Sequence, residues 1–340
     1  AEGRAVALLT MQLDDPSGYG RIVRDTSGGI IGIVEQKDAS PAQLEIREVN
    51  TGLLCCPARH LNHWLNALDN DNAQGEYYLT DIISQAAGDK VPVVAVHSSD
   101  IWEVSGVNDK RQLAELERVY QGRIADQLMR DGLMLKDPAR FDCRGSLEFG
   151  LDTVIDVNVV IEGKVKLADG VRIGPNCVLR DCEIGADTTV LENSVIERSR
   201  IGKHCNIGPF ARLRPDTELG DKAKIGNFVE IKKAVIGQGS KVNHLSYVGD
   251  AKIGDDVNIG AGVITCNYDG AHKHLTEIGD RVFVGSDVQL VAPVKVAADA
   301  TIGAGSTITK DVEAGNLAVS RSRQTQVPDW QRPKKASKKD

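Results

Sequence analysis

The chain has 340 residues, enough for two domains, and 41% of them are hydrophobic while only 4% are aromatic. A formal net charge of −7 argues against a general nucleic-acid-binding surface, because such surfaces are basic. No apolar run approaches the roughly 18 residues of a membrane span, and no secretory signal is visible. The seven cysteines form no metal-type CxxC pairs, which indicates reduced thiols in a cytoplasmic protein.

The first part of the chain, residues 1–108, has a mixed α/β pattern. Apolar runs predict strands over residues 1–13, 21–24, 29–35, 48–56 and 91–97, with the second and third as a hairpin. Helical spacing predicts helices over residues 61–68 and 77–87. No Gly-rich phosphate loop occurs in this part.

A long helix is predicted from Asp109 to about Asp131. Its apolar residues recur at helical spacing: Leu113, Leu116, Val119, Tyr120, Ile124 and Leu128. Residues 132–150 read as a linker, so residues 109–150 together are expected to connect two domains. The tail, residues 328–340, is basic and polar and is expected to be disordered.

From Ile155 to about Asp311 the sequence repeats in sixes. A branched aliphatic residue opens each hexad and a small residue or Val stands fifth; the openings include Ile155, Ile161, Leu167, Ile173, Ile184, Val190, Ile207, Leu213, Ile225, Ile231, Val242, Val248, Ile259, Val284, Leu290, Val296, Ile302 and Ile308. This period fits neither an amphipathic helix nor an alternating strand. It predicts a parallel β-helix over residues 151–327, with about 18 residues in each three-sided coil. Cys177 and Cys205 fall at fifth places and are expected in its core.

Stacking the coils brings candidate binding residues together. Arg214 falls under Lys232, about 5 Å away, with Gly249 above them. Like charges at that spacing repel unless an anion lies between them, which suggests a phosphate site. The alternative is a solvated basic edge neutralised by acids such as Glu230.

His244 falls at an outward third place of its hexad, with Asn227 below it and Ala261 above it. An imidazole there could act as a general base near neutral pH. Tyr247 and Asn258 are close and could bind a sugar.

The one large break in the repeat, Thr265–Glu277, is expected to serve function, because insertions gather on the binding face of a solenoid. It carries His272 and His274, which with His244 could instead form a three-His zinc site of the kind found in β-helix carbonic anhydrases.

Several segments closely resemble one bacterial family, the bifunctional N-acetylglucosamine-1-phosphate uridyltransferase/glucosamine-1-phosphate N-acetyltransferases. They are SKVNHLSYVGD, NIGAGVITCNYDG, VGSDVQLVAPV and RLRPDTELG with KIGNFVEIKKA, and upstream DDPSGYGRI, EVNTGLL and NAQGEYYLTDII. The resemblance covers essentially the whole chain. It implies a left-handed β-helix after a partial Rossmann-like nucleotidyltransferase domain.

For the β-helix half, the resemblance implies acetyl transfer from acetyl-CoA to the amine of glucosamine-1-phosphate, with His244 as the general base. The positions matching the sugar-phosphate site are Arg214, Lys232, Tyr247, Asn258 and Lys273. Those matching the acetyl-CoA site are Ala261, Asn267, Tyr268, Ser286, Ala304 and Arg321. The family is a homotrimer with sites between neighbouring β-helices, and Cys266 is expected to be a bystander.

For the first half, Gly20, Glu35, Asn50 and Asn108 match positions that bind UDP-N-acetylglucosamine, and Asn108 also matches a Mg²⁺ ligand. The Gly-rich loop, the catalytic Arg and Lys and the Asp that shares the Mg²⁺ would all precede Ala1. This 340-residue chain is therefore expected to acetylate without uridylylating, whereas full-length relatives also make UDP-N-acetylglucosamine for peptidoglycan and lipopolysaccharide precursors.

The leading hypothesis is an acetyl-CoA-dependent sugar-phosphate acetyltransferase that binds neither nucleic acid nor membrane. The alternative from another class is a non-catalytic trimeric β-solenoid scaffold that only binds sugar nucleotide. Turnover of acetyl-CoA with glucosamine-1-phosphate distinguishes the two.

Overall fold

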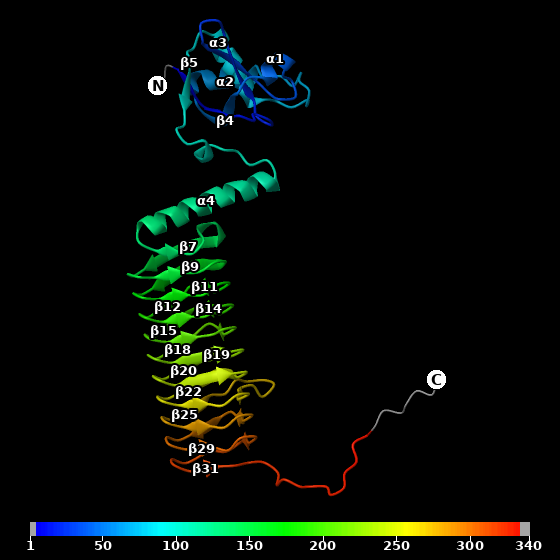
Figure 1. The fold of residues 1–340 in the computed structure, drawn as a ribbon. Coiled ribbons are helices and arrows are strands. Elements are labelled where there is room, and N and C mark those ends of the chain that lie inside the picture. The colour runs from blue at the N-terminus through cyan, green and yellow to red at the C-terminus, as the bar shows by residue number, and fades with distance from the viewer. Residues whose placement is uncertain (1–4, 334–340) are drawn as a thin grey trace, which may run out of the picture. The chain divides into compact units, whose positions relative to one another are not determined.

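A computed structural model describes residues 5–333. The chain folds as two compact units that divide between Val119 and Tyr120 (Figure 1). Within residues 5–333, no helix combines the length and the apolar character needed to cross a membrane.

The first unit contains one five-stranded sheet with the strand order β3-β2-β4-β1-β5. Strand β1 (Val6–Gln12) pairs antiparallel with β4 (Glu48–Cys55) and parallel with β5 (Val93–His97). Strands β2 (Arg21–Arg24) and β3 (Ile30–Val34) form the predicted hairpin. All five predicted strands are present, although residues 1–4 of the first prediction lie outside the described residues.

Helices α2 (Ala58–Asn66) and α3 (Ile82–Gly88) pack against this sheet, and the unit also contains the short helices α1 (Pro41–Leu44), η1 (Leu79–Asp81) and η2 (Ile101–Glu103). Helix α2 begins three residues before the predicted start at Leu61, because the chain turns directly after Pro57. Trp64 is fully buried against Ile82 and Ile83, and its indole N–H donates to Asp89 Oδ2 at 2.9 Å. Burial of these side chains fixes the two helices on the sheet.

Helix α4 (Lys110–Arg130) confirms the predicted long helix. Only its second half has a buried face: Ile124 and Leu128 pack against the β-helix core, while Leu113 and Tyr120 are exposed. The Gln121 carboxamide accepts from the Cys143 N–H at 2.8 Å and donates to the Cys143 carbonyl at 3.3 Å. The second half of α4 therefore closes the open end of the β-helix and satisfies backbone groups there.

The second unit is a parallel β-helix of three faces joined at corners, as the hexads predict (Figure 1). The first face holds β6 (Met134–Leu135), β8 (Val154–Ile155), β10 (Arg172–Ile173), β13 (Thr189–Val190), β16 (Asn206–Ile207), β19 (Lys224–Asn227), β21 (Lys241–His244), β23 (Asn258–Ile259), β26 (Phe283–Val284), β29 (Thr301–Ile302) and β31 (Leu317–Ala318).

Four strands bend around a corner and belong to both remaining faces: β7 (Phe141–Phe149), β9 (Val159–Leu167), β20 (Glu230–Ile236) and β22 (Tyr247–Ile253). The second face also holds β11 (Val178–Arg180), β14 (Val195–Glu197), β17 (Arg212–Leu213), β24 (Ile264–Cys266), β27 (Gln289–Val291) and β30 (Thr307–Ile308). The third face also holds β12 (Glu183–Ile184), β15 (Ser199–Ile201), β18 (Thr217–Leu219), β25 (Thr276–Ile278) and β28 (Val294–Val296).

Residues 132–150, predicted as a linker, are part of the β-helix. Strand β6 pairs with β8, the short helix η3 (Pro138–Arg140) follows it, and β7 pairs with β9 from Phe141 to Phe149. The hexad pattern did not show this coil, because Cys143 and Phe149 stand at the opening places, in register with Ile161 and Leu167, where later coils carry branched aliphatic residues. Phe141 and Cys143 are nevertheless buried in the same core.

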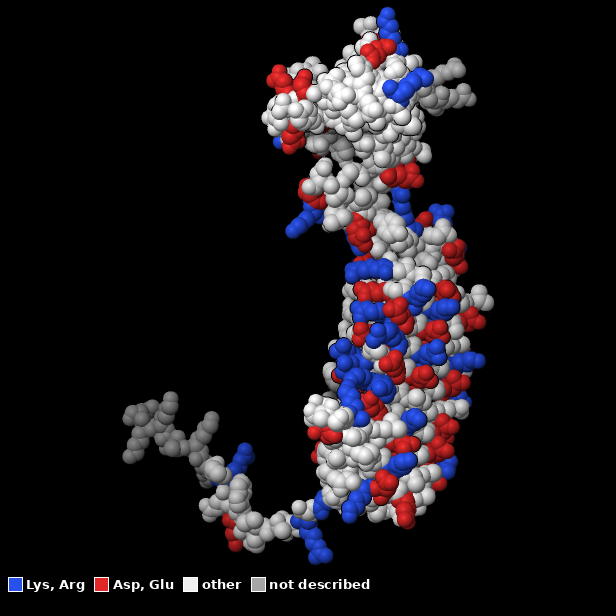
Figure 2. Space-filling view, turned by 180° about the vertical axis from the view of Figure 1, so that it is seen from behind, with Lys and Arg blue, Asp and Glu red and all other residues white. Residues whose placement is uncertain are grey.

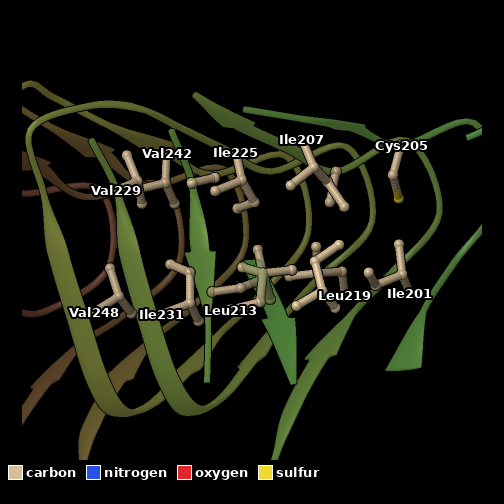
Figure 3. Packing of buried hydrophobic residues seen from close by; sticks show 14 of the residues in the cluster. Ile201, Cys205, Ile207, Leu213, Leu219, Ile225, Val229, Ile231, Val242 and Val248 are labelled. Atoms are coloured by element: carbon tan, nitrogen blue, oxygen red, sulfur yellow. The ribbon is translucent and has the colours of Figure 1, made fainter. Parts of the chain in front are cut away.

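The core is a column of stacked aliphatic side chains (Figure 3). Every residue predicted to open a hexad, from Ile155 to Ile308, is buried, with a relative exposure of at most 5%. Cys177 and Cys205 are also buried, as predicted, and burial raises the pKa of the Cys177 thiol to about 11. Each buried Ile or Val contributes about 1.5–3 kcal/mol, so stability is spread along the stack.

The corner between the first and second faces, called the first corner, needs a backbone with positive φ. In three successive coils this conformation is adopted by an asparagine, which tolerates positive φ better than most residues: Asn158, Asn176 and Asn193. In the next three coils Phe210, Phe228 and Leu245 hold it instead, at φ of 56°, 56° and 50°. Large side chains are uncommon in this region, and these three form an exposed apolar ridge.

Charged side chains of both signs are interspersed over the β-helix surface (Figure 2). One series on the second face alternates in sign from coil to coil and consists of Arg144, Glu162, Arg180, Glu197 and Arg212. Exposed pairs of this kind contribute little each. They leave few uncompensated charges along this face, which makes a group of neighbouring cations noticeable.

Candidate active site

Three cations gather at the corner between the second and third faces, called the second corner. The Arg214 N–H donates to the Ile231 carbonyl at 2.8 Å, so Arg214 lies in the coil under Lys232. Lys232 is in register with Gly249 of the next coil. The predicted stack is therefore present, and Lys273 reaches it from the inserted loop.

The Lys232 ammonium has a lowered pKa, chiefly because the Lys273 side chain lies against it, with partial dehydration and Arg214 adding to the effect. Arg214 differs, since its Nη1 pairs with Glu230 Oε1 at 2.7 Å. Glu230, the neutralising acid that the sequence suggested, therefore compensates Arg214 only. The side chains of Lys232 and Lys273 still face each other. A bound anion would relieve their repulsion.

Tyr247 lies beside these cations because Gly249 leaves room for it. A Cβ on Gly249 would stand 2.3 Å from the Tyr247 hydroxyl and 2.9 Å from Asn267 Nδ2. Asn267 is buried and donates to Asp250 Oδ2 at 2.5 Å and to the Tyr247 hydroxyl at 3.4 Å. These contacts anchor the start of the inserted loop to β22.

The inserted loop is an ordered hairpin. A bridge joins Tyr268 to Lys273, and Asp269 accepts from the N–H groups of Ala271 and His272 at 2.8 and 2.6 Å. His274 Nε2 lies 2.7 Å from Asp269 Oδ2. The His272 N–H and then the His274 side chain hold the pKa of Asp269 well below its usual range. The charged Asp269 therefore fixes the hairpin that carries Lys273.

The loop histidines do not assemble a metal site with His244. His274 is engaged with Asp269, and in the part of the chain that the structure describes no group of three or more His, Cys, Asp or Glu is placed to hold a metal ion.

His244 ends β21 at the first corner, with its side chain exposed. Its Nδ1 lies 2.7 Å from Oδ1 of Asn227, the residue in register one coil below. The His244 carbonyl accepts from the N–H of Gly262, next to Ala261, at 3.1 Å. The sequence predicts this stack, although it does not show that the Asn227 carboxamide contacts the imidazole.

Four of the six residues predicted to bind acetyl-CoA form a column above His244 at the same corner. The Ala261 carbonyl accepts from Asp287, next to Ser286, at 2.7 Å, and the Ser286 carbonyl accepts from Gly305, next to Ala304, at 2.9 Å. Arg321 Nη1 donates to the Ala304 carbonyl at 2.5 Å. Ala261 and Ala304 contribute only methyl groups to this column. The other two predicted residues, Asn267 and Tyr268, lie apart from it on the inserted loop.

The predicted site residues thus form two groups separated by the width of the second face. His244 is at the first corner, and Arg214, Lys232, Tyr247 and Lys273 are at the second. Among residues 5–333 no hydrogen bond or ion pair joins the two groups. Asn258 is on the first face, in register with Lys241 and Phe283.

A hollow of about 360 Å³ adjoins the second corner on the third face. Lys273, Asp250, Lys233 and Val235 contribute to its lining. Asp250 is buried to 7% exposure and lies 3.8 Å from the Lys233 ammonium. The hexad pattern did not predict the burial of this carboxylate, because the loop that covers Asp250 has no regular repeat.

In the first unit, three of the four residues predicted to bind sugar nucleotide come together at one end of β2. The Gly20 carbonyl accepts from the Asn50 N–H at 2.8 Å, and a Cβ on Gly20 would lie 3.2 Å from Glu35 Oε1. The same carboxylate oxygen accepts from the Thr80 hydroxyl at 3.0 Å. The Tyr19 hydroxyl donates to the Gly106 carbonyl at 3.3 Å, which brings the segment before Asn108 towards Gly20.

Asn108 alone does not fit a Mg²⁺ site. Its carboxamide is one neutral donor, and the metal favours carboxylate or phosphate oxygens in a near-octahedral set. Its backbone N–H donates to Gln112 Oε1 at 2.7 Å, and no carboxylate cluster suited to a metal occurs among the described residues.

A family profile described as "Bacterial transferase hexapeptide (six repeats)" matches residues 198–233 and 275–310. The "Bifunctional protein GlmU" of Marinobacter nauticus is 58% identical over 333 residues, covering 98% of this chain and 73% of that protein. Proteins of the same name from Ralstonia pickettii and Aromatoleum aromaticum are 58% and 57% identical over similar spans. Among solved structures, LpxA from Acinetobacter baumannii has 24% identity and a TM-score of 0.38, over 51% of this chain and 71% of its own.

These relatives cover 98% of the chain, so the match includes both units. The chain is a hexapeptide-repeat transferase and belongs to the family of bifunctional GlmU proteins.

Proposed function

We propose that the β-helix transfers acetyl from acetyl-CoA to the amine of glucosamine-1-phosphate. The observation that carries this is the group of Arg214, Lys232 and Lys273 at the second corner. Three cations beside a tyrosine hydroxyl suit a phosphate joined to a hydroxylated ring. Because the Lys232 and Lys273 side chains lie against each other, with Arg214 close by, an anion is the expected occupant.

His244 is the proposed general base. As the sugar amine attacks the thioester carbonyl, a C–N bond forms and the C–S bond breaks. His244 takes the proton that the amine loses, and that proton can pass to the departing thiolate. No covalent acetyl-enzyme is needed, and Cys266 has a raised pKa because of burial, which makes it a poor nucleophile.

The first-corner column is the proposed path of acetyl-CoA. Ala261, Ser286 and Ala304 present small side chains along it, and Arg321 lies at its end, where a cation suits the phosphates of the coenzyme. His244 at the other end would then meet the thioester.

A complete site is proposed to need a second copy of the chain. Within one chain the base and the phosphate cations stand at different corners, so a neighbouring β-helix can bring its second corner to the first corner of its partner. Asn258, Asn267 and Tyr268 could then complete the pocket. The homotrimer expected from the family resemblance satisfies this requirement.

The first unit is proposed to hold part of a UDP-N-acetylglucosamine site built from Gly20, Glu35, Asn50 and Asn108. Since Asn108 does not fit Mg²⁺ by itself, no metal-dependent step is assigned to these residues.

The test is a coupled assay that follows free thiol release from acetyl-CoA in the presence of glucosamine-1-phosphate. Release that depends on the sugar phosphate, with N-acetylglucosamine-1-phosphate as product, supports the proposal. Tight sugar-nucleotide binding without thiol release would favour the non-catalytic scaffold instead.

A further inference from the structure

We infer that Asn227 is a positioning residue that holds His244 in the form able to act as a base. This inference rests on the proposed acetyl transfer and names a residue that acts through His244. The evidence is the 2.7 Å contact between Asn227 Oδ1 and His244 Nδ1.

A carbonyl oxygen can only accept a hydrogen bond, so the imidazole must donate from Nδ1. A neutral imidazole carries one N–H, and placing it on Nδ1 leaves the lone pair on Nε2. The exposed nitrogen is then the one that can take a proton. The opposite tautomer would present an N–H to the amine and could not act as a base.

The backbone fixes this contact. Asn227 and His244 are the last residues of β19 and β21 and are in register. The Leu245 N–H donates to the Asn227 carbonyl at 3.1 Å, which ties the two coils together just beyond the imidazole. A Cβ on Gly226 would stand 1.9 Å from the Asn243 carbonyl, so only glycine permits this close approach.

Along the first corner of the described β-helix, the contact between an asparagine carboxamide and an imidazole is found only between the coils of Asn227 and His244. One coil lower, Gly208-Pro209-Phe210 takes the place of Gly226-Asn227-Phe228, and Pro209 offers no carboxamide. One coil above His244 the corner holds Ala261. Asn227 therefore is not a repeated structural asparagine of the corner; it stands only where its neighbour above is His244.

The first experiment reads the tautomer directly and needs no substrate. The full chain is labelled with ¹⁵N-histidine, and its seven imidazoles are observed by NMR at a pH where they are neutral. The His244 signals are those lost in His244→Ala. A protonated Nδ1 and an unprotonated Nε2 are expected in the native chain, and a mixed population in Asn227→Ala. Protonation at Nε2 in the native chain would overturn the inference.

The second experiment separates positioning from folding. Asn227→Ala should lower kcat by about 10–100-fold, the usual effect of losing the partner behind a functional imidazole, with both KM values nearly unchanged. Asn227→Asp keeps an acceptor and should restore the native tautomer. The matched control is Asn206→Ala, an exposed asparagine of the first face that is in register with Thr189 and Lys224.

The outcomes distinguish this inference from the proposed function. Full activity in His244→Ala would remove the base itself and with it the proposed chemistry. An inactive His244→Ala together with native kcat in Asn227→Ala would leave acetyl transfer standing and reject only the role of Asn227.

Discussion

His244 is the residue whose removal should affect acetyl transfer most. We expect His244→Ala to lower the rate about 10²–10⁴-fold, the usual contribution of a general base. The side chain is exposed and its backbone bonds remain, so the fold should be unchanged. Steady-state kinetics with a thermal melt as control measures both. Near-native turnover at neutral pH would contradict the assignment.

The second-corner cations should act on substrate binding instead. Arg214→Ala or Lys232→Ala should raise KM for glucosamine-1-phosphate about tenfold or more, with a much smaller change for acetyl-CoA, because the lost contact is to a non-reacting phosphate. Lys224→Ala, an exposed lysine on the first face, is the matched control. An unchanged sugar-phosphate KM in both variants would refute the phosphate site.

At the scale of the coil, the buried cysteines make stability depend on alkaline pH. Burial raises the pKa of Cys177 from 9.0 to about 11 and that of Cys182 to about 12. A raised folded-state pKa means that the stabilisation is complete below about 9 and is lost as the pH rises towards 11 or 12. For Cys177 this amounts to roughly 1–3 kcal/mol.

Thermal melts at pH 8 and pH 10.5 measure this loss. Lysines and tyrosines also titrate in that range, so the comparison is with Cys177→Ala/Cys182→Ala, which should lose less stability between the two pH values. At pH 8 an alkylating reagent should modify the exposed Cys55 and spare both buried thiols. Equal pH sensitivity of the two chains would show that the thiols do not carry the effect.

The sequence predicted the regular elements well because their determinants are local. In a hexad the inward position recurs at a fixed spacing, so Ile155 or Leu213 can be assigned to the core without knowing the rest of the fold. The same register placed Arg214 under Lys232. The first coil is not evident in the sequence because Cys143 and Phe149 keep the spacing but are not branched aliphatic residues.

The irregular parts of the site could not be predicted in the same way. Lys273 meets Lys232 only because Asp269 closes the hairpin and Asn267 anchors it to Asp250. These contacts depend on the path of a loop, which no repeat determines. Asn227 is an intermediate case, since the register placed it under His244 but could not show where its carboxamide points.

At the scale of the whole molecule, the first-corner ridge suggests how copies of the chain meet. Phe210 and Phe228 stack with ring centroids 5.2 Å apart, yet they remain 47% and 55% exposed, and Leu245 above them is 62% exposed. The three preceding coils carry Asn at this position of positive φ. Exposed apolar side chains that also strain the backbone are best explained by a partner surface that covers them. The ridge adjoins His244, where a second copy of the chain is proposed to complete the site.

We therefore expect Phe210→Asn/Phe228→Asn to dissociate the assembly without unfolding the chain. Asn suits positive φ, as Asn176 and Asn193 show, so each protomer should stay as stable as before or become more stable. Sedimentation should change from trimer to monomer, and acetyl transfer should fall with it, because base and phosphate cations would no longer meet. Leu151→Asn, 77% exposed and away from the ridge, should leave both unchanged. A double variant that sediments as an active trimer, or a native chain that is active as a monomer, would show that the corners do not need each other.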